Sequence, residues 1–226
     1  MSDSELITGV FKEELKNRFL CIVEVDGSDT LCYISSSCRL SNFVDMTGKT
    51  VLLKPTSTSN SRTKYSVYAL KRGKQYILLN MSQSNRLIEN ALHGRRFSFL
   101  GSRSIIRREQ VIEGYKCDLF IEDTRSVIEV KSILSFEKNA RFPTVFSQRA
   151  IDQLKKIEMM LDKRYKVIYL FVSMCTSVKY ITINEEMTEF YGLFKSCLQK
   201  GMLVSGYSVC FTDGVYKIKD KVEIIM

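Results

Sequence analysis

Two apolar runs around a short polar stretch are the feature that most limits how this chain can fold. Residues 115–121 and 126–132 are rich in β-branched and aromatic side chains, and such a pattern predicts a β-hairpin. If the loop is Asp123-Thr124, residues equidistant from it pair, and Asp118 lies directly opposite Glu129. Paired side chains on neighbouring strands are about 5 Å apart at Cβ, a separation at which two carboxylates repel each other.

A divalent cation between these carboxylates would turn the repulsion into a pair of metal ligands. Side chains two residues apart on a strand share a face, so Lys131 points the same way as Glu129 and can face a phosphate or activate a water. The spacing Asp-x10-Glu-x-Lys matches the core of the PD-(D/E)XK nuclease signature. The same alternation also fits a plain strand with one solvent-exposed face, and the pattern alone leaves both interpretations open.

Length and composition indicate a folded, basic protein. The chain has 226 residues, a hydrophobic content of 45% and only two prolines, which allows one large domain or two small ones with real cores. Lys and Arg number 34 against 25 Asp and Glu, giving a net charge of +9. This balance is compatible with nucleic acid or another polyanion as a partner.

Cysteine and histidine usage narrows the chemistry. The seven cysteines are scattered without a C-x-x-C pair, so reduced thiols in a cytoplasmic protein are expected and zinc is not. We expect no signal peptide and no membrane span, because no apolar run approaches about 20 residues. The single histidine, His93, leaves no Ser-His-Asp or multi-histidine site, so phosphoryl chemistry would depend on carboxylates and lysine.

The first 80 residues are predicted to form a small β-barrel. About five strands are expected, at residues 19–25, 30–34, 50–54, 65–70 and 74–79. The commonest five-stranded barrel is the OB-fold. A polar loop at residues 55–64 contains Arg62 and Lys64; it can follow a phosphate backbone or simply face solvent.

Residues 81–226 are predicted to form an α/β domain with a mixed central sheet. A helix is expected at 85–92, ended by Gly94, and a longer one follows Ser147 as its N-cap. Further expectations are strand-like segments at 95–100 and 104–109, an irregular segment at 140–146, strands at 165–173 and 203–211, and a helix from 184 to about 200. Alternating strands and helices predict crossover units and a sheet covered on both faces.

Several ordered segments resemble the sugar fermentation stimulation protein family over nearly the whole chain. They are Arg18-Phe19-Leu20, Asn85-Arg86-Leu87-Ile88-Glu89 with Ala91-Leu92, Ile106-Arg107-Arg108-Glu109, Asp118-Leu119-Phe120, Ile128-Glu129-Val130-Lys131-Ser132, Phe142-Pro143 and Arg149. The resemblance implies an OB-like N-terminal domain joined to a PD-(D/E)XK nuclease-like domain. It also implies DNA binding and a link to the regulation of sugar utilisation.

The resemblance further implies a set of functional residues. Asp118 and Glu129, with Glu89 on the preceding helix, would hold Mg²⁺ or Mn²⁺, while Lys131 and Gln153 would act on the attacking water. Glu89 and Gln153 also fit ordinary solvent-facing helix positions. The basic residues expected to contact DNA, or RNA, are Arg18, Arg62, Lys64, Arg107, Arg108 and Arg149.

The chain departs from the family pattern at three places. Ser36-Ser37-Cys38-Arg39-Leu40 replaces an Asn-Thr-Gly-rich turn, Thr144 stands where an acidic residue usually follows Phe-Pro, and Gln153 stands where the family has a histidine. The first departure puts in doubt whatever that turn contacts. The carboxylate-lysine pattern of Asp118, Glu129 and Lys131 is intact.

Two hypotheses of different classes follow. The first is a DNA-binding, metal-dependent nuclease that hydrolyses phosphodiester bonds with little sequence specificity. The second is a non-catalytic DNA-binding regulator of sugar utilisation on a nuclease-like scaffold. A carbohydrate-binding OB module is weaker, because the chain has no tryptophan to stack on a sugar.

Overall fold

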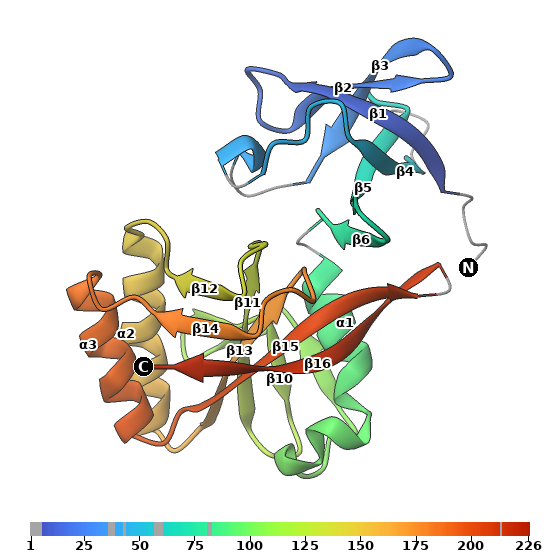
Figure 1. Cartoon of the computed structure of the whole chain (residues 1–226). Coiled ribbons are helices and arrows are strands. Elements are labelled where there is room, and N and C mark those ends of the chain that lie inside the picture. The colour runs from blue at the N-terminus through green and yellow to red at the C-terminus, as the bar shows by residue number, and fades with distance from the viewer. Residues whose placement is uncertain (1–5, 36–38, 43, 57–60, 81–82, 213) are drawn as a thin grey trace. The chain divides into compact units, whose positions relative to one another are not determined.

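A computed structural model describes residues 6–35, 39–42, 44–56, 61–80, 83–212 and 214–226. The turn residues 36–38 and the loop residues 57–60, discussed above, lie outside the described residues. The chain forms two compact units, one made of Met1–Gln83 with Cys210–Lys217 and the other of Ser84–Val209 with Ile218–Met226 (Figure 1). Across the described ranges, no helix has the length and apolar character needed to cross a membrane.

The first unit is a closed, OB-like β-barrel, which confirms the predicted small barrel. Its sheet has the order β3-β2-β1-β4-β5-β6 and is closed by a parallel pairing of β3 with β5. Buried and exposed residues alternate along β2 and β3, because one face of each strand lines the barrel core. The strands are β1 (Ile7–Glu14), β2 (Leu20–Val25), β3 (Ser28–Ile34), β4 (Thr50–Pro55), β5 (Tyr65–Arg72) and β6 (Gln75–Leu78); β1 was not predicted as a separate strand.

The turn between β2 and β3 is shorter than its polar sequence indicates. Val25 pairs with Ser28, so the loop consists of only Asp26 and Gly27. Both have positive φ, 49° and 76°. Tight two-residue hairpin turns require this conformation, which explains the Asp-Gly pair.

Residues 210–217 add an aromatic cluster to this unit. Phe211 lies 5.5 Å from Tyr76, Tyr216 lies 5.5 Å from Tyr68, and the rings of Phe211 and Tyr216 are 4.9 Å apart. Edge-to-face and tilted rings at these separations are favourable aromatic pairs.

The second unit is built on a mixed eight-stranded sheet of order β12-β14-β16-β15-β13-β11-β10-β7. β11, β13 and β15 run parallel, while β10 and β7 are antiparallel additions beside β11. The mixed α/β class predicted for this half is therefore confirmed. The strands are β7 (Ile106–Arg108), β10 (Leu119–Ile121), β11 (Ser126–Ile133), β12 (Asn139–Phe142), β13 (Lys166–Ser173), β14 (Tyr180–Ile183), β15 (Leu203–Thr212) and β16 (Val215–Ile225); β8 (Val111–Ile112) and β9 (Tyr115–Lys116) form a separate pair.

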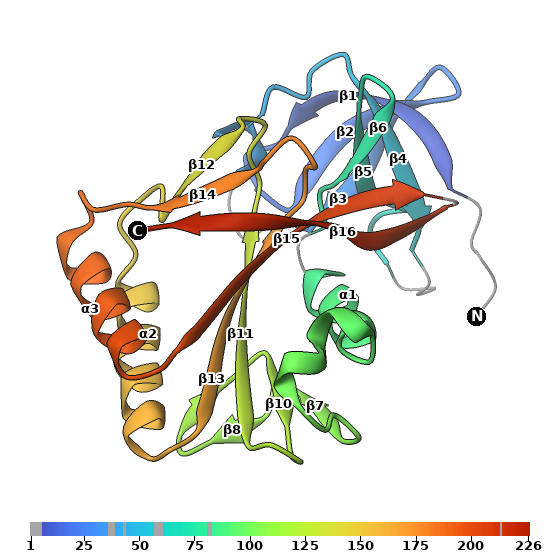
Figure 2. The same ribbon diagram turned by 60° about the horizontal axis from the view of Figure 1, so that its bottom comes forward.

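Helices cover both faces of this sheet (Figure 2). The helices α2 (Gln148–Asp162) and α3 (Thr188–Gln199) pack on one face, and α1 (Gln83–Leu92) with the 3₁₀ helix η2 (Arg95–Leu100) packs on the other. Leu154 and Ile157 of α2 share one core with Tyr169 and Phe194, whereas Phe97 of η2 lies 5.1 Å from Tyr207 of β15. Nearly every residue of β13 is buried, as the apolar run at 165–173 predicts.

Two predicted segments have a different structure, and one helix starts later than expected. Residues 95–100 form η2 rather than a strand, because Phe97 and Leu100, three apart, are the two buried positions. Residues 139–142 are not irregular but form β12, which pairs in parallel with β14. The helix expected from 184 begins at Thr188, since Asn184 instead bonds the Pro143 carbonyl and the Glu186 amide.

Candidate functional site

The β10–β11 hairpin has the predicted register. Leu119 pairs with Ile128 and Ile121 with Ser126, so one step further along the hairpin Asp118 faces Glu129. The loop contains the four residues 122–125 rather than two, because β10 ends at Ile121. The longer loop is symmetric about the predicted centre, and the register is unchanged.

Glu129 is the centre of a buried polar network. Its Oε1 accepts hydrogen bonds from Lys131 Nζ at 2.6 Å and from Gln153 Nε2 at 3.0 Å. Its Oε2 accepts from the hydroxyl of Tyr115. The residue is only 2% exposed, so the interpretation of this strand as one with a solvent-exposed face is wrong.

Lys131 links the hairpin to helix α2. Its ammonium donates to Gln153 Oε1 at 2.7 Å as well as to Glu129, and it lies 5.7 Å from the ring centre of Tyr169. The Ser147 hydroxyl accepts from the Ala150 amide at 3.3 Å and fixes the start of this helix. Arg149 is exposed one turn before Gln153, which places it on the same side of the helix.

Asp118 is half-buried and held by two donors. Its Oδ2 accepts from the Val130 amide at 2.8 Å, and its Oδ1 accepts from Asn85 Nδ2 at 2.9 Å. Ser84 beside Asn85 bonds Ser132 at 2.8 Å. The start of α1 is therefore tied to β11 through Ser84 and to the residue just before β10 through Asn85.

Burial shapes the ionisation of this network. Burial raises the pKa of Glu129, and the nearby charge of Asp118 raises it too, while Lys131 opposes both. Burial and the charge of Glu129 also raise the pKa of Tyr115 and of Tyr169. Both phenols therefore stay neutral at physiological pH, and Tyr115 acts as a hydrogen-bond donor.

The raised pKa of Glu129 predicts how stability changes with pH in the absence of metal. A carboxyl with a higher pKa in the folded state than in the unfolded state contributes most at low pH, and its contribution falls as pH rises through the folded pKa. We expect the unfolding free energy of the wild type, minus that of Glu129→Gln, to decrease from pH 4 to pH 7 in EDTA. Urea unfolding at each pH measures this difference, with Glu122→Gln as the control variant. A difference that rises with pH would contradict the raised pKa of Glu129.

A second prediction concerns Tyr115. Tyr115→Phe keeps the ring but removes the hydroxyl, so the buried Glu129 carboxylate loses a donor. Hydrogen bonds to charged groups contribute about 1.5–3 kcal/mol, and we expect a loss of this size in unfolding free energy at pH 7. The loss should shrink as the pH falls through the raised pKa of Glu129 and the carboxylate takes up a proton. Tyr33→Phe, at a half-exposed ring, is the control; equal losses in both variants would refute the role of the hydroxyl.

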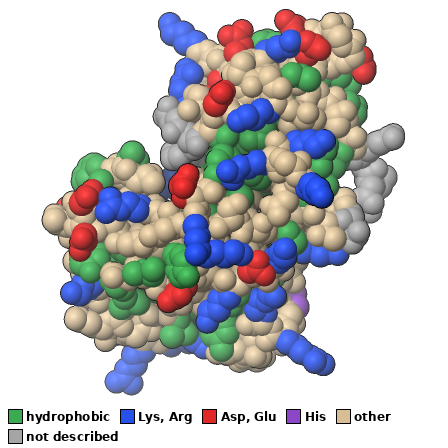
Figure 3. Space-filling model, viewed as in Figure 1, with side chains coloured by type: hydrophobic (Ala, Val, Ile, Leu, Met, Phe, Trp, Pro, Cys, Tyr) green, Lys and Arg blue, Asp and Glu red, His purple; other side chains and the backbone are tan. Residues whose placement is uncertain are grey.

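The other predicted residues are outside the hydrogen bonds around Glu129. Glu89 and Arg108, expected to bind metal and nucleic acid respectively, pair with each other at 3.2 Å, and Arg107 pairs with Glu122 at 2.5 Å. Arg62 is exposed, and Lys64 lies 5.3 Å from the ring centre of Tyr65 in the barrel unit. Lys and Arg side chains are spread over the face shown in Figure 3 rather than gathered in one patch.

Four residues of possible functional importance were not singled out from the sequence. Asn85 is four residues before Glu89, so helical spacing could have placed it on the same face. Nothing in the sequence indicated that Tyr115 belongs to the site, because residues 117–118, which are in no strand, separate β9 from β10. In the barrel unit, Phe19 and Tyr33 stack at 6.3 Å, both more than a third exposed, with the Arg18 guanidinium 4.8 Å from the Phe19 ring centre.

The donor set suits a hard divalent cation. The site contains two facing carboxylates, each hydrogen-bonded to an amide side chain, Asp118 to Asn85 and Glu129 to Gln153, and Mg²⁺ and Mn²⁺ prefer oxygen ligands. No described thiol or imidazole is hydrogen-bonded to these side chains. Among the described residues no group of three or more His, Cys, Asp or Glu is placed to hold a metal, so the protein would supply two carboxylates here.

The fold defines the class: an OB-like barrel followed by an α/β domain with a mixed central sheet. Residues 15–79 match the model of the SfsA N-terminal OB domain, and residues 82–214 match that of the sugar fermentation stimulation protein RE domain. The chain belongs to the sugar fermentation stimulation protein family.

Relatives and one solved structure agree with this assignment. The chain is 26% identical over 226 residues to a sugar fermentation stimulation protein homolog from Caldanaerobacter subterraneus subsp. tengcongensis, covering 98% of this chain and 97% of that protein. A homolog from Ruminiclostridium cellulolyticum is 24% identical, covering 96% of each. The structure of Pyrococcus furiosus SfsA in complex with Ca²⁺ matches with a TM-score of 0.85 at 17% identity, covering 100% of this chain and 98% of that one.

Proposed function

We propose that this protein is a DNA-binding, metal-dependent nuclease that hydrolyses phosphodiester bonds with little sequence specificity. The observation that carries the proposal is the network in which Asp118, Glu129, Lys131 and Gln153 meet on the hairpin and α2. A solvated structural strand would keep two facing acids and a lysine in water. Here Glu129 is buried and Asp118 and Lys131 are half-buried, although burial of charge is costly.

In this proposal Asp118 and Glu129 hold Mg²⁺ or Mn²⁺, which supplies charge stabilisation and an acidified water when bound. Lys131 now bonds Glu129 and Gln153 at nearly equal distances, 2.6 and 2.7 Å. With a cation bound at Glu129, Lys131 would keep its hydrogen bond to Gln153 and its ammonium would face the water or the phosphate. Lys131 then holds or moves a proton of the attacking water, or neutralises the charge that develops on the phosphate.

Substrate contact is assigned to the barrel unit and to Arg149. Phe19 and Tyr33 present a stacked aromatic pair beside Arg18, and exposed aromatic rings with nearby cations are typical of single-strand binding by OB-folds. Exposed Arg149, one turn from Gln153, is placed to contact a phosphate next to the network. The relative from Pyrococcus furiosus is described in complex with Ca²⁺, which supports a cation site in this family of folds.

The alternative is a non-catalytic DNA-binding regulator. One observation favours it: both oxygens of Glu129 already accept hydrogen bonds from protein groups. A network satisfied in this way can be a structural element that specifies the fold, as buried ion pairs are in some proteins.

Metal-dependent digestion separates the two. Purified protein is incubated with single- and double-stranded DNA and RNA in EDTA, Mg²⁺ or Mn²⁺, and cleavage is followed beside metal affinity. Cleavage that requires the metal and is lost in Glu129→Gln supports the nuclease. DNA binding without cleavage, and no binding of Mg²⁺ or Mn²⁺ at millimolar concentration, would favour the regulator.

A further inference from the structure

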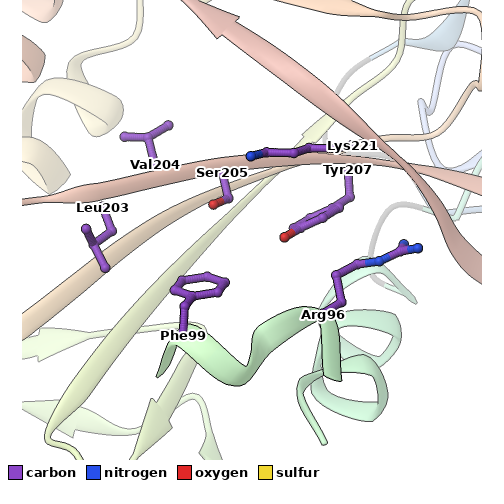
Figure 4. A pocket seen from close by; sticks show the side chains of 7 residues that line it. All are labelled: Arg96, Phe99, Leu203, Val204, Ser205, Tyr207 and Lys221. Carbon is purple, nitrogen blue, oxygen red and sulfur yellow. The ribbon is translucent and has the colours of Figure 1, made fainter. Parts of the chain in front are cut away.

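A pocket of about 520 Å³ lies between β15, β16 and η2 in the α/β unit. Figure 4 shows Phe99 pointing from η2 toward β15, while Ser205 and Tyr207 point from β15 toward η2. Arg96 and Lys221 complete the lining together with Leu203 and Val204. The volume falls within the range of about 300–1,000 Å³ typical of small-molecule sites.

The pocket and the Glu129 network lie on opposite faces of the sheet. Partners in a parallel pairing share a face, and Glu129 pairs with Tyr169, whereas Ser205 pairs with Leu170. Neighbours such as Tyr169 and Leu170 point to opposite faces. A ligand in the pocket is therefore separated from the network by the sheet itself.

Two cations in this pocket have no acidic partner. Within the described part of the chain, no carboxylate forms an ion pair with Arg96 or Lys221, although many other surface Lys and Arg residues are paired. Arg96 instead lies 5.7 Å from the ring centre of Tyr207. Both side chains are exposed and so can turn toward an anion.

The same pocket presents an aromatic surface. The ring of Phe99 is 44% exposed, whereas Tyr207 is 5% exposed and forms the floor. The 3₁₀ helix that carries Phe99 is fixed, because Arg103 donates to the carbonyls of Phe97 and Gly101 at 2.8 and 2.6 Å. Gly101 has a φ of 84°, a conformation that favours glycine. The backbone that carries the exposed ring is thus held by hydrogen bonds on both sides of Phe99.

We propose that this pocket binds a nucleotide, with the base stacked on Phe99 and the phosphate held by Arg96 and Lys221. A lone phosphate would need the cations but no exposed ring, and an apolar ligand would need the ring but no unpaired cations. A base joined to a phosphate would contact both the exposed ring and the unpaired cations. This chemistry is shared by a free mononucleotide and by one residue of a nucleic-acid strand, and the site is independent of the proposed cleavage chemistry.

Calorimetric titration in EDTA tests the site with three ligands. We expect AMP to bind more tightly than ribose 5-phosphate, which lacks the base, and than adenosine, which lacks the phosphate. Phe99→Ala should weaken AMP binding roughly tenfold, since the base loses its stacking on an aromatic ring. Arg96→Gln and Lys221→Gln should each have an effect of about the same size, because each removes a charge-assisted contact.

Matched control variants test whether the loss of AMP binding is specific to the pocket residues. Phe146→Ala removes a ring that is 67% exposed outside the pocket, and Lys156→Gln removes an exposed lysine on α2; neither should change AMP binding. Glu129→Gln should also leave it unchanged, which separates this site from the cleavage proposal. A short oligonucleotide assayed with the same variants distinguishes a free nucleotide from a strand.

Three outcomes would overturn the proposal. The first is equal affinity for AMP and ribose 5-phosphate, which would show a simple anion site. The second is unchanged AMP binding in Phe99→Ala, Arg96→Gln and Lys221→Gln. The third is no binding of either the nucleotide or the oligonucleotide by wild-type protein whose circular dichroism shows it folded.

Discussion

Lys131→Ala should slow metal-dependent DNA cleavage by about two to three orders of magnitude while leaving metal binding intact. The ammonium contacts Glu129 and Gln153, so its proposed role is on the water or the phosphate rather than on the cation. Removing a preorganised group that stabilises developing charge costs about two to three orders of magnitude in rate. Asp118→Asn and Glu129→Gln should lose cleavage to at least a similar extent, but together with affinity for Mg²⁺ and Mn²⁺. The measurement is cleavage rate beside metal affinity in the three variants.

Comparing cleavage rate and metal affinity between the variants tests the role of each residue. Lys116→Ala and Glu122→Gln alter a lysine and an acid nearby that are exposed and outside the network, and both should keep wild-type cleavage. DNA affinity in EDTA should change little in every variant. If Lys131→Ala lost metal binding as completely as Glu129→Gln, the lysine would be holding the carboxylate in place instead of serving the reaction.

Stability provides an independent check on the same variants. An asparagine at position 118 has one oxygen for the two donors Val130 N and Asn85 Nδ2, so one donor loses its acceptor. We expect about 1–3 kcal/mol lower unfolding free energy for Asp118→Asn. Glu129→Gln removes a buried charge whose pKa burial raises, so at neutral pH its cost should be smaller. Cleavage rates are then compared only under conditions where both variants remain folded.

The hairpin could be predicted because its determinants are local. A symmetric loop and the two-residue period of a strand are enough to place Asp118 opposite Glu129 and to put Lys131 on the same face. These signals do not depend on the rest of the chain. The same holds for the Ser147 cap of α2, which is confirmed by its bond to the Ala150 amide.

The missed features depend on contacts between distant segments. β12 is stabilised by its pairing with β14 about forty residues later, and its polar-apolar alternation covers only four residues, too short a run to reveal a strand by itself. Tyr115 reaches Glu129 only because the chain bends between β9 and β10. The ion pair of Glu89 with Arg108 could not be predicted either, because Arg108 is brought near α1 through β7, which pairs with β10. The burial of Glu129 could not be predicted from the sequence either, because it depends on which residues α2 covers.

Phe19→Ala and Tyr33→Ala should weaken binding of single-stranded DNA, and the double variant should weaken it most. The two rings stack on each other and are both exposed beside Arg18, so a base can continue the stack on their outer face. Stacking of one base on an aromatic side chain contributes about 1–3 kcal/mol, which corresponds to a roughly five- to hundredfold loss in affinity for each ring that contacts a base. Fluorescence anisotropy with a short oligonucleotide in EDTA measures it.

Duplex DNA and salt separate stacking from charge. In a duplex the bases are already stacked on each other, so loss of the rings should affect duplex binding far less than single-strand binding. Arg18→Gln should act differently, lowering the dependence of log affinity on log salt by about 0.7 for a single strand, because one fewer phosphate is neutralised. Phe146→Ala, an exposed ring in the α/β unit, is the matched control. Equal losses on duplex and single strand in Phe19→Ala would mean that the ring supports the barrel rather than contacting bases, and the DNA contact would then have to be sought among the basic residues alone.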